Sequence, residues 1–397
     1  MSQELPLAGM KVVDLSQFLA GPYCSMFLAD FGAEVVKVEM PGVGDGYRRA
    51  GPPFKNGVSA CFLSVNRNKK SVTIDLKKPR GREMLLKLLA DADVLLENFR
   101  PGTMEKLGLD YDVVSEVNPA IIYCSISAYG QTGPSALKGG FDLILQGVGG
   151  IMGITGQEDG PPVKAGVSVT DVGAGLLGAF AILTAYAYRQ RTGLGQHIDT
   201  SLLECAVSWH SFMASAYFMT GQVPTRLGSA HSVAVPYQAF KTKDGYINVA
   251  AATQALWETL CRVLNAEHLL GDPRFVTGED RLKNRAELVA IIEEFFAADV
   301  SEAWLSRLDE AGLPCGPIYR FDQLFEDPQV LHREMVVEME HPQAGRIKTL
   351  AVPIKLSRTP GSIRTAPPLL GEHTREVLLS LGYSDDDIEA LRNDKVI

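Results

Sequence analysis

Short apolar runs of strand length alternate with helical segments through the first half of the chain, and this alternation constrains the fold more than any other feature. The predicted strands occupy residues 10–15, 33–39, 71–76, 92–97 and 120–127. One helix is predicted at 21–31, directly after an Ala-Gly-Pro sequence, and another at 80–90. Strand–helix–strand alternation is typical of a mainly parallel sheet covered by helices, whose ligands usually bind at the carboxyl ends of strands. We therefore predict an α/β fold.

A different pattern follows near residue 225. Residues 237–250 contain Lys-Asp-Gly between two alternating runs, which predicts a β-hairpin. Helical segments are then expected near 254–266, 281–298 and 301–311. This combination predicts a smaller α+β domain at 225–325.

The remaining segments complete the predicted domain organisation. Residues 1–220 form the expected large Rossmann-like domain, and 326–397 is expected to return to it. Within this last segment we predict a strand at 346–356 and then two terminal helices. Ser384 followed by Asp387 resembles a capping box for the last of them.

Charge and cysteine usage exclude several classes of partner. The chain of 397 residues has a formal net charge of -9, which argues against a nucleic-acid-binding protein. Its six cysteines are far apart and form no C-x-x-C pair, a pattern typical of reduced thiols in a cytosolic protein. No basic segment leads into an apolar signal sequence, and the apolar stretch 173–188 is short and rich in Gly and Ala. We expect a cytoplasmic protein that does not bind membranes.

One segment matches a cofactor motif. Gly173 to Gly178 fit G-x-G-x-x-G, and Asp199 lies at about the distance expected for the ribose-binding acid of a dinucleotide fold. The motif, however, lies late in the chain and not in the first strand–helix–strand unit. Its neighbours Ala174 and Ala179 are small, which favours a helix packed closely on its surroundings over nucleotide binding.

Asp171 immediately precedes this predicted helix. Its carboxylate could serve as the N-cap, where unpaired backbone N–H groups and the helix dipole stabilise negative charge. The same groups would keep a reactive carboxylate ionised, and the neighbouring glycines would leave room for a substrate. Position alone favours the cap.

Other catalytic patterns are absent from the sequence. The seven histidines are dispersed, and neither H-E-x-x-H nor paired Cys/His spacing occurs, so no metal site is predicted. A G-x-S-x-G nucleophile turn is also missing. Basic residues near predicted strand ends could together meet the phosphates of an anionic substrate, although each alone is more typical of solvated surface. They are Arg48, Arg49, Arg67, Lys69, Lys70, Lys77, Lys78, Arg100 and Lys106.

Segments spread over essentially the whole chain resemble the class III CoA-transferase family. In the first half they are VVDLSQFLAGP (12–22), GAEVVKVE (32–39), SVNRNKKSVTIDLK (64–77), DVLLENFRPG (93–102) and IIYCSISAYGQTGP (121–134). In the second half they are TDVGAG (170–175), RTGLGQHIDTSLLE (191–204), PYQAFKTKDGYI (236–247), GLPCGPI (312–318) and PLLGEHT (368–374). Each segment alone is weak, whereas their order and spacing together are highly specific.

This resemblance implies an interlocked, ring-shaped homodimer in which each subunit has a Rossmann-like large domain and a small α+β domain. It also implies that Asp171 is a nucleophile that attacks an acyl-CoA thioester and then holds CoA as an aspartyl-CoA thioester. Acyl-CoA and an organic acid would be the substrates. Coenzyme A would enter as a substrate thioester, and no resident cofactor is expected.

The resemblance also assigns a CoA-binding region. Its expected residues are Phe18, Leu19, Ala20, Ile74, Lys77, Asn98, Phe99, Arg100 and Lys106. Formyl-CoA:oxalate enzymes have glutamine where this chain has Leu19, and their glycine-rich flap is absent from the stretch before Tyr237. These departures argue against formyl or oxalyl transfer.

SVNRNKKS, YCSISAYGQTGP and VPYQAFKTKDGYI resemble the branch that uses succinyl-CoA as donor and dicarboxylates as acceptors. The second, unreacted carboxylate of such an acceptor needs a cation, for which Arg48 is the leading candidate, followed by Arg226 and His231. A transferase that uses a monocarboxylate or oxalate is an alternative.

Acyl-CoA racemases are the rival from another reaction class. They share an aspartate at the position of Asp171 but use a histidine where this chain has Phe141, and phenylalanine cannot transfer a proton. A non-enzymatic CoA-binding protein is less favoured, because Asp171 is retained within its motif.

Overall fold

The computed structural model describes residues 4–397, which form two compact units. Unit 1 comprises the described residues up to Ile151 together with Lys164–Met219 and Pro328–Ile397, and unit 2 comprises Met152–Val163 and Thr220–Asp327. Residues 152–163, expected in the large domain, therefore belong with the small unit. The backbone explains this difference, because the Gly228 N–H donates to the Gly156 carbonyl at 2.8 Å.

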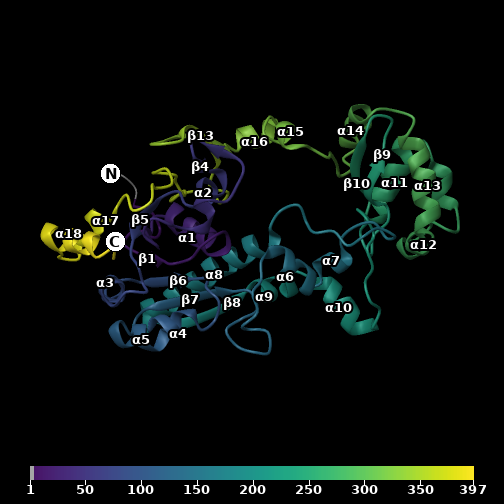
Figure 1. Ribbon diagram of the computed structural model, residues 1–397. Coiled ribbons are helices and arrows are strands. Elements are labelled where there is room, and N and C mark those ends of the chain that lie inside the picture. The colour runs from purple at the N-terminus through teal and green to yellow at the C-terminus, as the bar shows by residue number, and fades with distance from the viewer. Residues whose placement is uncertain (1–3) are drawn as a thin grey trace. The chain divides into compact units, whose positions relative to one another are not determined.

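Unit 1 is built on a parallel sheet of six strands (Figure 1). The strands are β1 (Lys11–Asp14), β2 (Glu34–Glu39), β5 (Lys69–Thr73), β6 (Val94–Glu97), β7 (Ile122–Ser127) and β8 (Gln196–Ser201). Their spatial order is β5-β2-β1-β6-β7-β8, and every neighbouring pair is parallel. This is the doubly wound order, in which the chain reverses direction across the sheet between β1 and β6. The prediction of a mixed α/β fold with a parallel central sheet is confirmed.

Helices cover both faces of this sheet. One face carries α1 (Ala20–Asp30), α8 (Val169–Thr192) and α9 (Leu202–Ser208), whose buried side chains share an apolar cluster with β1 and β7. The other carries α3 (Pro79–Leu89), α5 (Tyr111–Val117) and the terminal helices α17 (Thr374–Ser380) and α18 (Asp385–Asn393). Ser384 and Asp387 form the predicted capping box of α18.

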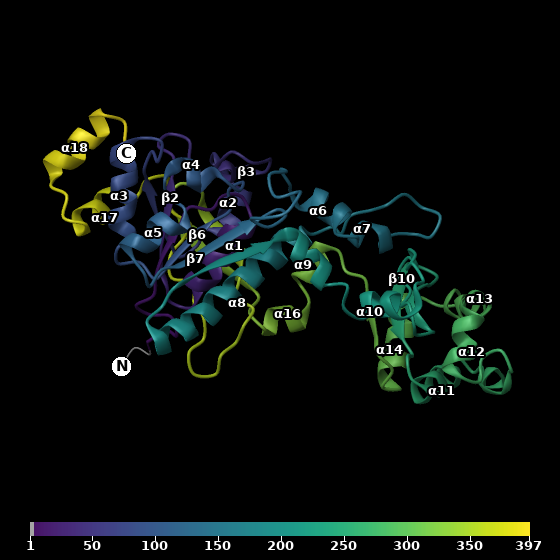
Figure 2. The ribbon, with the colours of Figure 1, turned by 90° about the horizontal axis from the view of Figure 1, so that it is seen from below.

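Helix α8 is long and apolar enough to span a membrane by length and composition alone. Its packing identifies it instead as a core helix, lying along the sheet beside α1 (Figure 2). A Cβ on Gly175 would lie 2.6 Å from the Ala20 carbonyl oxygen, and one on Gly178 would lie 2.7 Å from Cδ1 of Ile126. The glycines of the G-x-G-x-x-G motif lie inside the helix and not in a turn after a strand, so close packing explains them.

Smaller elements complete unit 1. They are η1 (Gly46–Arg48), α2 (Ala60–Val65), α4 (Thr103–Leu107), α6 (Asp142–Val148), most of α10 (Ser211–Thr220), α16 (Pro328–His332) and the hairpins β3 (Phe54–Lys55)–β4 (Val58–Ser59) and β12 (Val336–His341)–β13 (Gly345–Leu350). The strand predicted at 346–356 is thus the second arm of a hairpin whose first arm was not predicted. Helix α7 (Ile151–Ile154) lies where the chain passes from unit 1 to unit 2.

Unit 2 combines a three-stranded antiparallel sheet with helices. Its strands are β9 (Tyr237–Lys241), β10 (Tyr246–Ala250) and β11 (Cys315–Pro317), and its helices are α11 (Gln254–Val263), η2 (Glu267–Gly271), α12 (Gly278–Lys283), α13 (Arg285–Phe296), α14 (Ser301–Glu310) and α15 (Phe321–Leu324). The predicted hairpin is confirmed as β9–β10. The helix predicted at 281–298 is interrupted at Asn284, which separates α12 from α13.

Candidate active site

The loops that follow β1 and β6 meet at the topological switch point of the sheet, where doubly wound folds bind ligands. The Asn98 side chain joins them, because its Nδ2 donates to the Gln17 carbonyl at 2.8 Å and its Oδ1 accepts from the Gln17 N–H at 2.8 Å. Gly21 allows the tight turn, since a Cβ there would lie 2.2 Å from the Cβ of Ser16. The structure thus places the predicted residues Phe18, Leu19 and Ala20 beside Asn98.

Phe18 lies at the centre of an aromatic group in this region. Its backbone has φ of 65°, a left-handed conformation that costs energy in a non-glycine residue, and its N–H donates to Oδ1 of Asp45 at 2.9 Å. Its ring packs edge-on against Tyr47 and Phe141, with centroid distances of 5.7 and 6.0 Å. Gly46 makes room for this ring, because a Cβ would lie 2.5 Å from it.

Fully buried ion pairs support the same loops. Lys37 lies 2.9 Å from Asp45 and donates to the Ser16 carbonyl at 2.6 Å, while Lys69 lies 3.1 Å from Asp14. Burial opposes the charge on each group and lowers the pKa of Lys69 to about 8, whereas the two lysines hold the pKa of Asp14 well below its usual range. Buried charges survive only when paired and hydrogen-bonded, so these pairs fix the positions of the loops.

Asp171 is the third residue of α8 and not its N-cap, which is Ser168. The neighbouring N–H groups are already engaged, since Thr170 donates to Asp142 and Val172 to the Ser168 carbonyl. Among residues 4–397, no hydrogen bond to the Asp171 carboxylate is found. Burial, followed by the negative charge of Asp142, raises the pKa of Asp171 to about 7. Burial and the like charge of Asp142 thus oppose the ionisation that the helix N–H groups were expected to favour.

Asp142 is also buried, but unlike Asp171 its carboxylate accepts several hydrogen bonds. Its Oδ1 accepts from the N–H and hydroxyl of Thr170 at 3.0 and 2.8 Å, and its Oδ2 accepts from Gln146 at 2.7 Å. Oε1 of Gln146 in turn accepts from the Ala165 N–H at 2.8 Å. Asp142 therefore fixes the start of α8 and places a second carboxylate near Asp171. No sequence motif pointed to it, because the two lie 29 positions apart.

The negative charges of Asp171 and Asp142 also act on the Tyr47 hydroxyl. Burial raises the pKa of this hydroxyl, and the negative charge of Asp171 raises it further. The packing of Gly175 on Ala20 brings the first turns of α8 against the start of α1. Asp171, Tyr47, Phe18 and Phe141 thus belong to one region beside the switch point.

The remaining predicted CoA contacts lie after β5 and β6. Lys77, Arg100 and Lys106 are exposed, and Arg100 lies against the loop before Phe141, since a Cβ on Gly139 would lie 2.4 Å from its Nη2. Phe99 is partly buried. Ile74 is 2% exposed and packs in the core, so the structure does not present it at the surface as a contact for CoA.

Glu97, at the carboxyl end of β6, is a buried acid that no motif indicated. Its Oε2 accepts from the Phe99 N–H at 2.8 Å. Burial raises the pKa of Glu97 to about 7. Burial thus raises the pKa of both Glu97 and Asp171 to about 7, and of these two acids Asp171 is the one without a hydrogen-bond donor in the described part of the chain.

Arg48 is held by Glu39. Its Nε and Nη2 each donate to the Glu39 carboxylate at 2.7 Å, its Nη1 donates to the Pro368 carbonyl at 3.1 Å, and its guanidinium covers the Phe62 ring. A substrate carboxylate would have to compete with Glu39 for this cation.

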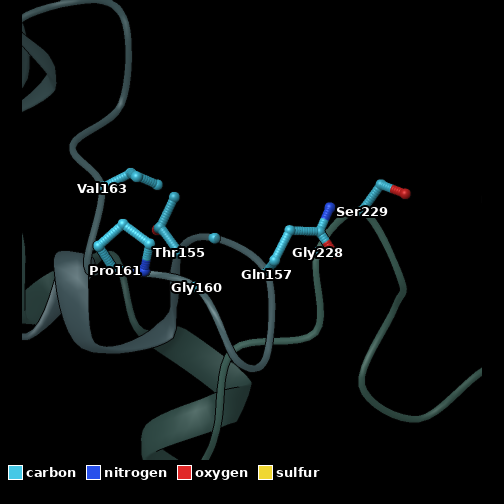
Figure 3. Close-up of a pocket in the computed structure, with 8 residues that line it drawn as sticks. Thr155, Gln157, Gly160, Pro161, Val163, Gly228 and Ser229 are labelled. Atoms are coloured by element: carbon cyan, nitrogen blue, oxygen red, sulfur yellow. The ribbon is translucent and has the colours of Figure 1, made fainter.

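Arg226 and His231 belong to unit 2. Arg226 donates to the carbonyls of Gln157 and Gly160 at 3.2 and 2.8 Å, beside a cavity of about 430 Å³. Figure 3 shows the lining of this cavity, which is formed by the 155–163 segment and by Gly228 and Ser229. The His231 ring stacks on Tyr237 with a centroid distance of 4.9 Å.

A doubly wound sheet with a buried acid beside its switch point defines an α/β enzyme with its site at the strand ends. The chain belongs to CoA-transferase family III, whose model matches residues 7–374. It is 44% identical over 387 residues to the succinyl-CoA:glutarate CoA-transferase of Mus musculus, covering 97% of this chain and 89% of the relative. It is 38% identical to the succinate–glutarate CoA-transferase of Agrobacterium fabrum, covering 95% and 96% of the two chains.

Solved structures agree in fold. A CaiB/BaiF family protein from Brucella suis superposes with a TM-score of 0.85 at 39% identity, covering 96% of this chain and all of that one. The predicted family and its enzymatic class, a CoA-transferase, are confirmed.

Proposed function

We propose that this enzyme transfers CoA from succinyl-CoA to a dicarboxylic acid through an aspartyl-CoA thioester at Asp171. The observation that supports this most directly is the state of Asp171. It is a largely buried carboxylate without a hydrogen-bond donor among residues 4–397, beside the loops at the switch point. A carboxylate with a raised pKa is a better nucleophile when ionised, and no strong donor has to be displaced before it attacks. Relatives named for succinyl-CoA and glutarate support the choice of substrates.

The proposed steps conserve every group. An oxygen of Asp171 attacks the succinyl thioester carbon, and CoA thiolate leaves to give an aspartyl-succinyl anhydride. The thiolate attacks the aspartyl carbon, which releases succinate and forms the aspartyl-CoA thioester. A carboxylate oxygen of the acceptor attacks that thioester carbon and releases the thiolate again. The thiolate then attacks the acceptor's carbonyl carbon, which yields the new acyl-CoA and regenerates Asp171. CoA is a substrate throughout.

We place the CoA moiety along the loops after β1, β5 and β6. Phe18, Leu19 and Ala20 would lie at its reacting end, whereas Asn98 would position them through Gln17. The exposed cations Lys77, Arg100 and Lys106 suit the phosphates, and the partly buried Phe99 completes this proposed surface.

Racemisation is less well supported. That chemistry needs an acid or base on each face of the α-carbon, and Phe141, which is exposed and packed on Phe18, cannot supply one. Transfer to a monocarboxylate or to oxalate would use the same nucleophile and differs only in the acceptor.

We also propose a homodimer, interlocked as the family resemblance implies. Large apolar side chains of α8 are exposed, including Leu176, Phe180 and Leu183, of which Phe180 is 69% exposed. Phe218 and Met219 of α10 are 80% and 86% exposed. Exposed large apolar side chains on two helices are typical of an interface, and a second copy is the occupant we favour. Six free thiols suit a reducing compartment, in line with a cytoplasmic location.

The decisive experiment incubates the enzyme with succinyl-CoA and a panel of dicarboxylates, with new acyl-CoA species followed by chromatography. We expect transfer to at least one acid, no turnover by Asp171→Ala, and hydroxylamine trapping of Asp171 only after exposure to acyl-CoA. Proton exchange on a 2-methylacyl-CoA, without transfer to any acid, would overturn the proposal.

A further inference from the structure

The Tyr47 hydroxyl is a hydrogen-bond donor that the fold does not use. Tyr47 belongs to η1 and packs against a small apolar cluster of α1 and α2, which is formed by Met26, Phe27 and Val65. Its backbone N–H donates to Oδ1 of Asp45 at 2.9 Å. Its side-chain hydroxyl, by contrast, has no hydrogen-bond partner in the described part of the chain. A phenol that is held by packing and has no acceptor is available to a ligand.

A series of direct contacts connects Tyr47 with Asp171 within unit 1. The Tyr47 ring meets the Phe18 ring edge-on with a centroid distance of 5.7 Å, and Phe18 meets Phe141 in the same way at 6.0 Å. Phe141 directly precedes Asp142, whose carboxylate accepts both hydrogen bonds of the residue before Asp171. The phenol and the proposed nucleophile therefore belong to one continuous cluster of side chains.

Helix packing brings the two groups together by a second route. Gly175, one turn after Asp171, lies against the first turn of α1, where a Cβ would be 3.3 Å from the Cβ of Tyr23. Tyr23 packs against the same apolar cluster as Tyr47. After burial, the charge of Asp171 raises the pKa of the Tyr47 hydroxyl most, ahead of Asp45. Because such effects fall with distance, the hydroxyl is directed toward Asp171.

The surface beside these two groups is open to a substrate. Phe18 and Phe141 are 40% and 65% exposed, and Tyr47 and Asp171 are each only partly buried. Among residues 4–397, no hydrogen bond joins the hydroxyl to the carboxylate, so neither group blocks the other. Burial and the nearby carboxylates hold the pKa of Tyr47 well above its usual value, which keeps the hydroxyl protonated and able to donate.

We propose that Tyr47 is a catalytic residue whose hydroxyl donates a hydrogen bond to the oxyanion formed when Asp171 attacks the succinyl thioester. This inference rests on the proposed function for the identity of the nucleophile. As the new C–O bond forms, the carbonyl electron pair moves onto the thioester oxygen, which Tyr47 stabilises without giving up its proton. The pair then returns, the C–S bond breaks and CoA thiolate leaves. The last step passes through the equivalent intermediate on the acceptor, so the same hydroxyl acts there.

The test replaces Tyr47 by phenylalanine, which removes the hydroxyl and keeps the packed ring. Loss of one oxyanion donor should lower kcat with succinyl-CoA and glutarate about 100- to 1,000-fold, whereas the Kd for free CoA, measured by calorimetry, should not change. Tyr23→Phe is the matched control, since burial raises the pKa of Tyr23 and the charges that act on its hydroxyl are those of Arg67 and Asp30. This control should retain the wild-type kcat.

A single turnover without acceptor isolates the proposed step. Hydroxylamine trapping of Asp171 after rapid mixing with succinyl-CoA should show adduct formation slowed by the same factor in Tyr47→Phe. An unchanged rate would overturn the inference and leave the proposed function intact, whereas absence of the adduct in the wild type would defeat both. Weaker CoA binding or a lower unfolding temperature in Tyr47→Phe would indicate a structural role and also overturn the inference. If Tyr47→Phe does not fold, Tyr47→Leu replaces it, with the same expected loss in the rate of adduct formation.

Discussion

Replacing Asp142 by asparagine should move the acid limb of the pH–rate profile to lower pH. Asp142 raises the pKa of Asp171 by charge repulsion, second only to burial. Asparagine keeps an oxygen that can accept from the Thr170 N–H and hydroxyl but removes the charge. Because Asp171 must be ionised to attack, a lower pKa makes it reactive at lower pH.

The size of the effect follows from the pKa of about 7 for Asp171. At pH 6 about a tenth of the wild-type enzyme would have this carboxylate ionised. If removing one nearby like charge lowers the pKa by about one unit, about half would be ionised. The value of kcat/KM at pH 6, relative to each enzyme's plateau, should therefore rise roughly fivefold.

The assay measures kcat/KM for succinyl-CoA between pH 5.5 and 8.5, because this parameter reports groups of the free enzyme. Two matched variants separate charge from structure. Thr170→Val removes one hydrogen bond to Asp142 without changing any charge, and Glu97→Gln removes the other acid whose pKa is about 7. Neither should move the limb. An acid limb that stays in place in Asp142→Asn, or that moves with Glu97→Gln, would refute the assignment to Asp171.

Three further changes have defined outcomes. Asp171→Asn should stabilise the protein above pH 7 by on the order of 2–4 kcal/mol. The pKa of Asp171 is about 7 in the folded state and lower in the unfolded state, so the wild type loses stability as the pH rises from about 4 to 7, whereas asparagine has no charge to lose it by. Equal unfolding midpoints of the two proteins at pH 8 would contradict this. Arg48→Ala should lower the free energy of unfolding by about 3–5 kcal/mol, because it leaves Glu39 buried and unpaired, and denaturant titration measures this loss; a stable variant with altered acceptor selectivity would instead favour the carboxylate-clamp prediction. Gly175→Ala should separate α1 from α8 and reduce both stability and turnover, and unchanged values would show that the helices tolerate a Cβ at this contact.

Most of the sheet was predictable because strands β1, β2, β6 and β7 are almost completely buried and contain short apolar runs. Strands β1, β2, β6 and β7 lie within the predicted ranges, whereas β5 begins two residues before its predicted range. Strand β8 was missed because its sequence, QHIDTS, is polar and its side chains are largely exposed at the sheet edge.

The predicted start of α8 was misplaced because it depends on a contact with a residue that is distant in the sequence. The helix was expected to open at the glycine motif, directly after Asp171, whereas it begins at Val169. Asp142, which is distant in sequence, accepts both hydrogen bonds of Thr170 and draws that residue into the helix. Tertiary contact here outweighs local propensity.

The buried ion pairs were missed as well, although one signal was present. Lys37 stands between valines in a strand that is buried along most of its length, and such a position requires a charged partner. The partner, Asp45, comes from a turn that the apolar pattern does not describe.

Lys37, Asp45 and Asp142 share a physical role. Each holds a loop or helix end near Asp171, and each loses the hydration of its charge on burial. Lys37 and Asp45 fix the Phe18 backbone in a strained conformation, and Asp142 fixes the first turn of α8 while raising the pKa of its neighbour. A chain selected for stability alone would replace such groups with apolar ones. A chain that must present one desolvated carboxylate to a thioester needs rigid surroundings that do not donate hydrogen bonds to it. The buried charges therefore support the proposed nucleophile more strongly than the apolar core does, because the core is explained by folding alone.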